Sequence, residues 1–449
     1  MGGEEMNFPE KCEVVVVGGG PAGSLTATYL AQKGHDVVLL DKQKHPRYNV
    51  GESLIPDFWK YTDMAGASGK ILADGFIQKA GGTVSWKGRI NTHTFRGFGY
   101  KRPALHVERD RFDHILLENA REKGVKVFEE TGVTTTNFDD PGNPVVHYRY
   151  QDQPAGDLAC KYVVDASGQS AVVARQLGLR VVDEAFRFMS VWGYFKDSRY
   201  IAFGGKAHRP KDLSQAPPTT FVSSLGDSGE AGWSWHIILR DVTSVGFVLP
   251  IEMMKSVRET DEAWEKFFVR KCQQSPVLNR LLEQATFVPD SVRLIRDYSY
   301  RSTRLAGPGY FLVGDAAGFV DPIFSVGVVL AMYSAYAAAW ALDRCLRDPG
   351  SATETQEIFQ WQLQGRHEIA RSLALPRYQT DDGVSERAKS AIRMEKRTVK
   401  DLMNLASTLT SRSENFKDMA GDGFGRELTG EQMIIIDKLD LDWEDTAPG

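Results

Sequence analysis

The sequence predicts an α/β protein in which a Rossmann-like domain is interleaved with an antiparallel β-sheet domain and followed by a helical C-terminal region. Three observations support this prediction. A glycine-rich turn joins a β-branched run to a helical pattern near the N-terminus, and two later apolar strands, near residues 165 and 315, end in acidic turns. Residues 185–255 are rich in aromatic and β-branched residues separated by turn signals, which is typical of an antiparallel sheet.

The first unit of the chain, residues 12–42, has the pattern strand, tight turn, helix, strand. Val14 to Val17 form a continuous β-branched run, as expected for a buried parallel strand. In the following GxGxxG turn, the first glycine permits the turn, the second lets backbone approach a pyrophosphate, and the third lets helix and strand pack closely. Because the helix N-terminus faces the phosphate, the turn predicts a dinucleotide site. Its predicted cofactor-binding residues are Gly18, Gly20, Pro21, Ala22 and Gly23.

Acidic residues at the ends of three strands extend this prediction. Asp41 ends the second strand 18 residues after Gly23, where a partner for a ribose hydroxyl is expected. The segment "VVDASG" places Asp165 at the end of a strand, and "YFLVGDAA" places Gly314 and Asp315 after another strand. An acid at such a strand end can hold the ribityl hydroxyls of a flavin, which favours FAD over NAD. The plainer interpretation of each acid is a helix cap.

The remaining elements follow from periodicity. Residues 107–124 predict an amphipathic helix, and two hairpin strands follow it. The apolar run 326–342 is short for a membrane span and follows an acidic motif, so a buried helix is expected there. The predicted domains are residues 8–80 with 105–185 and 290–350 for the dinucleotide fold, 81–104 with 186–289 for the substrate-side β-sheet, and 351–449 for a helical C-terminal region with an acidic tail.

Composition excludes several functions. A net charge of -5 argues against nucleic acid as a partner, since nucleic acid requires a basic surface. The four cysteines are widely spaced and the nine histidines show no ligand spacing, so neither a disulfide framework nor a metal site is expected. The first residues contain no apolar signal-peptide segment. These features predict a cytoplasmic protein without membrane contact.

Motifs in order along residues 12–350 carry a family resemblance. GxGxxG, then Arg109 in "VERDRFD", then "DASG" and "GDAA" resemble the FAD-dependent aromatic hydroxylase superfamily. Within it, the chain resembles the flavin-dependent halogenases, in particular the branch that acts on phenolic or carrier-tethered precursors of natural products. The segments that carry this narrower resemblance are "PRYNVGESLIP" (46–56), "GFIQKAGGTVSW" (75–86), "GWSWHII" (232–238) and "DPIFSVGVVLA" (321–331).

The resemblance implies an activity and a catalytic lysine. Reduced FAD and O2 would convert chloride or bromide to hypohalous acid, and Lys79 would deliver the halogen to an electron-rich ring. Burying an ammonium group without a partner is costly, so the site must supply a partner or shift the lysine pKa. A neutral Lys79 could accept the halogen as a chloramine, and a charged one could orient hypohalous acid. The sequence leaves both open, and the plainer alternative is a snorkelling surface lysine.

The halide is expected at the start of the apolar helix. Backbone amides around Ser325, Val326 and Gly327 lie at a positive helix end, which is an anion site. The resemblance assigns the amides of Val326 and Gly327 to the halide and makes Ser325 a catalytic residue. The plainer interpretation of Ser325 is an N-cap.

Two further segments are assigned by the resemblance. Trp233 and Trp235 lie on one face of a strand and would line a tunnel between flavin and substrate, although Ile238 stands where the motif has proline. Two strand tryptophans are also common in a core. Glu52 and Ser53 would belong to a strap over the flavin. Their plainer interpretation is a polar loop.

The resemblance implies an aromatic small molecule, halide and O2 as partners. Because only one nucleotide-binding unit is visible, a separate flavin reductase is also expected. Whether the substrate is free or tethered to a carrier protein stays open, as does the halide. His106 or Glu108 could act as a base beside a phenol. Three alternatives are a single-component aromatic monooxygenase, a reductase of the geranylgeranyl-reductase type, and a flavin protein without turnover.

Overall fold

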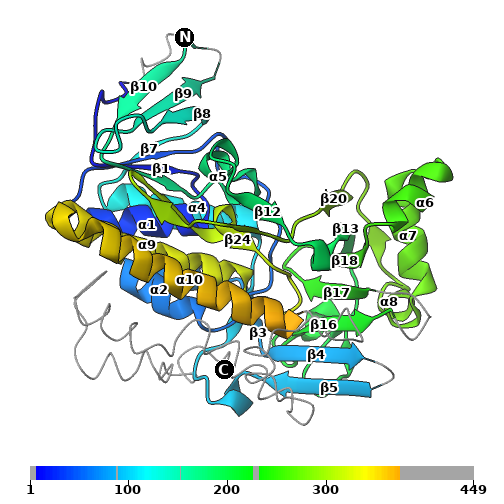
Figure 1. The fold of residues 1–449 in the computed structure, drawn as a ribbon. Helices are drawn as coiled ribbons and strands as arrows, with labels where there is room; N and C mark the ends of the chain where they lie inside the picture. Colours follow the sequence, from blue (N-terminus) through cyan, green and yellow to red (C-terminus); the bar gives the residue numbers. More distant parts are fainter. Residues whose placement is uncertain (1–6, 87–88, 152, 226–231, 375–449) are drawn as a thin grey trace, which may run out of the picture.

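The computed structural model describes residues 7–86, 89–151, 153–225 and 232–374. Two β-sheets organise these residues (Figure 1). The first is mostly parallel and packed with long helices, and the second is a large sheet flanked by three shorter helices. The predicted fold class is confirmed. Residues 375–449, which include the predicted acidic tail and most of the C-terminal region, lie outside the described residues.

The mostly parallel sheet has the strand order β22-β23-β11-β1-β2-β7, and its only antiparallel neighbours in the described chain are β22 and β23. Every residue of β1 and β2 is buried, which explains their continuous apolar sequences. The strands are β1 (Val14–Val17), β2 (Val37–Leu40), β7 (Lys126–Phe128), β11 (Tyr162–Asp165), β22 (Ala306–Gly307) and β23 (Tyr310–Leu312).

Helices cover this sheet, with α1 packed against both α4 and α9. The apolar run predicted as a buried helix forms α9, whose central residues are almost all buried. Nowhere in the described ranges is a helix both long and apolar enough to cross a membrane. The helices of this half are α1 (Pro21–Gln32), α2 (Phe58–Ala65), α3 (Ser68–Asp74), α4 (Arg109–Glu122), α5 (Val172–Gln176), α9 (Gly327–Arg347) and α10 (Ala352–Ala374).

The second sheet has the order β19-β13-β18-β17-β16-β4-β5, with β20 also paired to β13. It was predicted to be antiparallel, but β4 and β16 run parallel. These two strands are far apart in the chain, so no hairpin forces them to be antiparallel. Helices α6 (Met253–Glu259), α7 (Trp264–Gln274) and α8 (Pro276–Leu281) flank the sheet. Its strands are β4 (Gly81–Trp86), β5 (Arg89–Thr94), β13 (Phe188–Lys196), β16 (Thr219–Ser224), β17 (Trp233–Ile238), β18 (Thr243–Pro250), β19 (Thr286–Phe287) and β20 (Arg293–Arg296).

Four smaller sheets complete the described fold. The strand pair β3–β6 lies between the mostly parallel sheet with its helices and the second sheet (Figure 1), and it places Lys79 opposite Ala104. The small sheets are β10-β9-β8, β12-β21-β24, β14-β15 and β3-β6. Their strands are β3 (Ile77–Lys79), β6 (Ala104–His106), β8 (Thr131–Asn137), β9 (Val145–Tyr150), β10 (Gly156–Ala159), β12 (Arg180–Val182), β14 (Tyr200–Ile201), β15 (Ala207–His208), β21 (Tyr300–Ser302) and β24 (Gly318–Phe319).

The division into domains stays a prediction. Strands of the second sheet come from both of its predicted segments, 81–104 and 186–289. Strand β20 extends this sheet into the segment 290–350, which the sequence analysis assigned to the dinucleotide fold. The chain therefore crosses between the halves several times, and these crossings bring distant segments together at the site described next.

Candidate active site

The glycine-rich turn lies between β1 and α1 and has room for nothing larger than glycine at two positions. Gly18 has a φ of +106°, and a Cβ there would lie 2.5 Å from the carbonyl oxygen of Ala166. A Cβ on Gly23 would lie 1.8 Å from the carbonyl oxygen of Gly18. The turn therefore presses the start of α1 against the ends of β1 and β11, and leaves backbone exposed to the adjacent cavity.

We expect Gly23→Ala to destabilise the protein by about 3 kcal/mol or more, because α1 would have to move away from β1. Urea unfolding should measure the loss, and flavin absorbance of the purified protein should fall. The control is Gly69→Ala on the exposed face of α3, where a Cβ would meet no atom within 4 Å. That change should be neutral or stabilising by up to ~1 kcal/mol. Equal unfolding midpoints for both variants would refute the packing argument.

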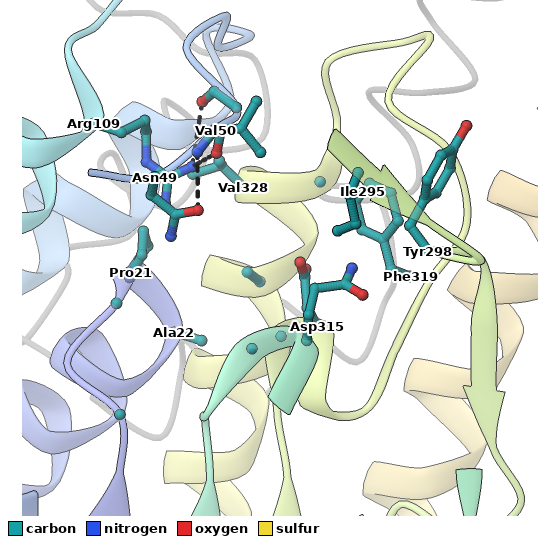
Figure 2. Close-up of a pocket in the computed structure, with 18 of the residues that line it drawn as sticks. Pro21, Ala22, Asn49, Val50, Arg109, Ile295, Tyr298, Asp315, Phe319 and Val328 are labelled. Atoms are coloured by element: carbon teal, nitrogen blue, oxygen red, sulfur yellow. Dashed lines mark hydrogen bonds between the residues drawn. The ribbon is translucent and has the colours of Figure 1, made fainter. Parts of the chain in front are cut away.

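A cavity of about 460 Å³ opens beside this turn. Its walls come from the turn, from the segment 46–56, from β17, from the 3-10 turn Gly314–Ala316 and from the start of α9. Figure 2 shows Arg109, Asn49 and Val50 on one side, Asp315 near the centre, and Ile295, Tyr298 and Phe319 opposite. The predicted site residues that line it are Gly18, Gly20, Pro21, Ala22, Asp41, Glu52, Ser53, Arg109, Trp233, Trp235, Gly314, Asp315, Ser325 and Gly327.

Four predicted site residues are not part of this lining. They are Gly23, which packs against Gly18, and Lys79, Asp165 and Val326. Asp165 was predicted to hold a flavin, but its carboxylate accepts hydrogen bonds from the amides of Ser167 and Val173 at 3.0 and 2.8 Å. This carboxylate therefore fixes the start of α5, which is the plainer interpretation of an acid at a strand end.

Asp41 lines the cavity and organises the glycine turn at the same time. One carboxylate oxygen accepts the amide of Gly19 at 2.7 Å, and the other accepts the amide of Gln43 at 2.8 Å. Asp41 thus ties the turn to the segment after β2. Asp315 lies across the cavity, where burial raises the pKa of its carboxyl to about 6 and the charge of Arg109 opposes that rise.

Arg109 connects α4 to the strap, which we define as residues 46–56. Its Nε and Nη2 donate to the two carboxylate oxygens of Asp113 at 2.8 and 3.0 Å. Its Nη1 donates to the carbonyl of Val50 at 2.5 Å, as the dashed lines in Figure 2 show. A charged residue therefore holds the strap backbone against the cavity.

The strap is also held from β13, by a tyrosine that was not among the predicted site residues. Glu52 is buried and accepts the hydroxyl of Tyr194 at 2.6 Å, and burial raises the pKa of Glu52 to about 7. The hydroxyl of Tyr194 is also 3.0 Å from that of Tyr48 on the strap. These contacts join β13 to the strap. Tyrosines of an apolar-patterned strand gave no sequence signal for such a role.

The two tryptophans of β17 lie together in the cavity wall. The ring centroids of Trp233 and Trp235 are 5.9 Å apart, and both side chains are buried. Trp235 donates its indole N–H to Ser244 at 3.2 Å. Trp192 from β13 packs beside Trp235, so three indoles line the cavity together.

Lys79 is buried, with 3% of its surface exposed, and its contacts are to uncharged oxygens. Its Nζ donates to the hydroxyl of Ser53 at 2.8 Å and to the carbonyl of Leu54 at 2.9 Å. Burial lowers the pKa of this amine to about 7. The interpretation as a surface lysine is therefore wrong. Ser53 lines the cavity, so it stands between the cavity and Lys79.

The turn before α9 lies next to this lysine. Ser325 has a φ of +56°, and its hydroxyl is 3.0 Å from that of Ser53. The residue in the N-cap position of α9 is Val326, and no side chain caps the helix. Ser325 is thus not an N-cap. Within the described part of the chain, no side chain accepts a hydrogen bond from the first amides of α9, and such amides can bind an anion.

The residues present fit FAD. The narrow glycine turn and the start of α1 would hold the pyrophosphate, with Asp41 at the ribose end. The strap, the 3-10 turn with Asp315 and the indole wall would enclose the flavin. Each part of a dinucleotide-binding site is therefore supplied by a residue of this chain that lines one continuous cavity.

Comparisons with known proteins agree with this geometry. A family model described as FAD binding domain matches residues 11–356. A tryptophan 2-halogenase of Chondromyces crocatus is 35% identical over 365 residues, covering 80% of this chain and 66% of its own. A flavin-dependent halogenase of Metacordyceps chlamydosporia is 32% identical over 376 residues, covering 79% of this chain and 69% of its own.

A solved structure extends the likeness to the whole described fold. The myxobacterial chondrochloren halogenase, described as a new variant of FAD-dependent halogenases, superposes with a TM-score of 0.74 at 29% identity. The alignment covers 98% of this chain and 99% of that one. This chain spans about two thirds of the length of the curated relatives it matches, as the shares of 66% and 69% state.

Proposed function

This chain belongs to the flavin-dependent halogenases of the FAD-dependent aromatic hydroxylase superfamily, and from that membership we propose that it halogenates an electron-rich, phenolic ring through Lys79. The family uses reduced FAD, which a separate reductase supplies. The observation that carries the proposal is a buried amine that contacts no carboxylate of the described residues, one serine away from the flavin cavity and beside the turn that begins α9.

Reduced FAD, when bound, supplies with O2 the oxidation of chloride or bromide to hypohalous acid. The residues of this chain then have three tasks. The amides of Val326 and Gly327 would hold the halide, the indoles of Trp233 and Trp235 would keep the substrate ring away from the flavin, and Lys79 would receive the halogen. The balanced step at Lys79 is R–NH2 + HOX → R–NHX + H2O, and the ring then takes X in exchange for a proton.

The ring must be electron-rich because the halogen carrier is a modest electrophile. A phenol meets this requirement, and so does an indole, which the name of the tryptophan 2-halogenase relative makes the second candidate. The phenol is proposed in free or carrier-tethered form. Neither His106 nor Glu108 serves as a base for it, since His106 bonds to Thr220 and Ile238 while Glu108 pairs with Arg240.

The test is a reaction with FAD, a flavin reductase, NADH, O2 and bromide, with product read by mass spectrometry. The panel should hold free phenols, one phenol loaded on a carrier protein, and tryptophan. Brominated phenol is the expected product. Hydroxylated product that forms without the reductase would favour the monooxygenase, and brominated tryptophan alone would replace the phenol by the indole.

The reactive form of Lys79 gives a pH prediction. If the neutral amine accepts the halogen, product formation should rise as pH increases through about 7, the lowered pKa of Lys79. Below that value the amine carries a proton and has no lone pair to donate. Product rates should be measured from pH 5.5 to pH 9 with the reductase in excess, and a diffusible trap should monitor hypohalous acid. A rate that falls through the same range would make the charged amine the reactive form.

A further inference from the structure

A chain of hydrogen bonds leads from Lys79 to a buried histidine, His106, on β6. Lys79 donates to Ser53, the hydroxyls of Ser53 and Thr220 are 2.7 Å apart, and Thr220 is 2.9 Å from Nε2 of His106. The chain ends where Nδ1 of His106 meets the carbonyl of Ile238 at 3.0 Å. We call these four side chains, Lys79, Ser53, Thr220 and His106, the relay. They come from β3, the strap, β16 and β6.

The end of the relay fixes the direction of every bond in it. A backbone carbonyl can only accept, so Nδ1 of His106 carries a hydrogen. His106 is fully buried, and no carboxylate is among its hydrogen-bond partners, so the ring is neutral and Nε2 is an acceptor. Thr220 must therefore donate its single hydrogen to Nε2. Ser53 must in turn donate to Thr220, since that hydroxyl has no hydrogen left.

This direction determines what Ser53 offers to the reacting groups. With its own hydrogen committed to Thr220, the Ser53 oxygen can only accept, and it accepts from Lys79 and from Ser325. The two N–H groups of a neutral Lys79 are then used by Ser53 and by the carbonyl of Leu54. The lone pair of the amine is left free on the remaining side.

We propose that His106 is a positioning residue that acts through Thr220 and Ser53 to keep the lone pair of Lys79 unoccupied. The proposal rests on the proposed function of Lys79. Two histidines lie within electrostatic reach of the amine, His93 on β5 and His106 on β6, and burial lowers the pKa of both, so neither competes for the proton near neutral pH. The ring centroid of Phe95 lies 5.3 Å from Nζ.

The matched variants are Thr220→Val and Thr220→Ser. Valine keeps the β-branched shape and removes the hydroxyl, so the hydrogen of Ser53 is released and can turn to the nitrogen of Lys79. Serine keeps the hydroxyl and should preserve the relay. His106→Leu removes the terminal acceptor from the other end and should act as Thr220→Val does, which provides a second test if one variant folds poorly.

The readout is the ionisation of Lys79, followed by NMR of ε-13C-labelled lysine in the FAD-free full-length protein. The resonance is assigned by its absence in Lys79→Met. A hydrogen bond donated to the neutral amine favours that form, so the midpoint should fall by about one pH unit in Thr220→Val and His106→Leu. In Thr220→Ser it should stay within a few tenths of the wild-type value. Halogenated product per NADH should fall about tenfold in the first two variants.

An unchanged midpoint in both Thr220→Val and His106→Leu would overturn the proposal. So would a shift in Thr220→Ser as large as in Thr220→Val, because the effect would then come from packing. The titration needs no turnover, so it tests the relay even if the wild-type protein makes no halogenated product. Absence of product would count against the proposed function, while the titration alone would decide whether the hydrogen bonds of the relay have the proposed direction.

Discussion

Replacing Lys79 with methionine should reduce halogenated product by about three orders of magnitude, within the range expected for a group that takes part directly in the transfer. Methionine fills a similar volume and cannot accept a halogen as an amine does. The cavity lining does not include Lys79, so FAD binding and NADH consumption by the coupled reductase should persist. Hypohalous acid should then leave the protein and be captured by a diffusing 1,3-diketone trap. Product and trapped halogen are both measured by mass spectrometry.

The same variant carries an internal control for folding. Wild-type Lys79 has a lowered pKa in the folded state, so the unfolded chain binds more protons between about pH 7 and pH 10.5. Wild-type stability therefore rises with pH across that window, and it is lower at the neutral end. Lys79→Met should lose this slope and be at least as stable at pH 7. Loss of product with a lower melting temperature would point to misfolding and would contradict the assigned role.

Several parts of the site could be predicted because each is formed by residues that are close together in the sequence. The glycine turn needs a strand, a positive φ at Gly18 and a close approach at Gly23, and these are written within twelve residues. The turn at Ser325 is equally local. The burial of Lys79 could be suspected from the apolar, glycine-rich run around it, and the structure confirms that burial.

Other features could not be predicted because one pattern serves two purposes. An acid at the end of a parallel strand can bind a cofactor or cap a helix. Asp165 fixes the start of α5, whereas Asp41 bonds to the glycine turn and also lines the cavity. Which one applies depends on where the next helix begins. The position of that helix cannot be derived from the strand-end pattern, so the pattern alone predicts a flavin contact for Asp165.

Long-range contacts were beyond sequence reasoning for a simpler reason. Ser53, His106 and Thr220 have ordinary polar side chains in three separate segments, and nothing near any of them identifies the other two. The parallel pair β4–β16 joins strands that are more than a hundred residues apart in the chain and brings Thr220 to this place. A polar residue in an otherwise buried strand is the one signal that could have marked it.

Replacing Arg109 with methionine should lower the free energy of unfolding of the FAD-free protein by about 3–5 kcal/mol. Its partner Asp113 is fully buried, and both carboxylate oxygens are bonded to Arg109 at 2.8 and 3.0 Å. Without Arg109, the one side-chain contact left to the carboxylate among the described residues is the longer one to Arg47 at 3.4 Å. An uncompensated buried charge is the physical cause, and urea unfolding measures it.

A double variant separates stability from cofactor binding. Arg109→Met with Asp113→Leu removes the buried charge, so most of the lost stability should return. The strap should remain loose in both proteins because the bond from Arg109 to the carbonyl of Val50 is missing. The dissociation constant for FAD, measured by fluorescence titration, should therefore be about tenfold higher in the single and in the double variant, which corresponds to ~1.4 kcal/mol. Restored FAD affinity in the double variant would show that Arg109 acts through Asp113 alone and that its contact to the strap is dispensable.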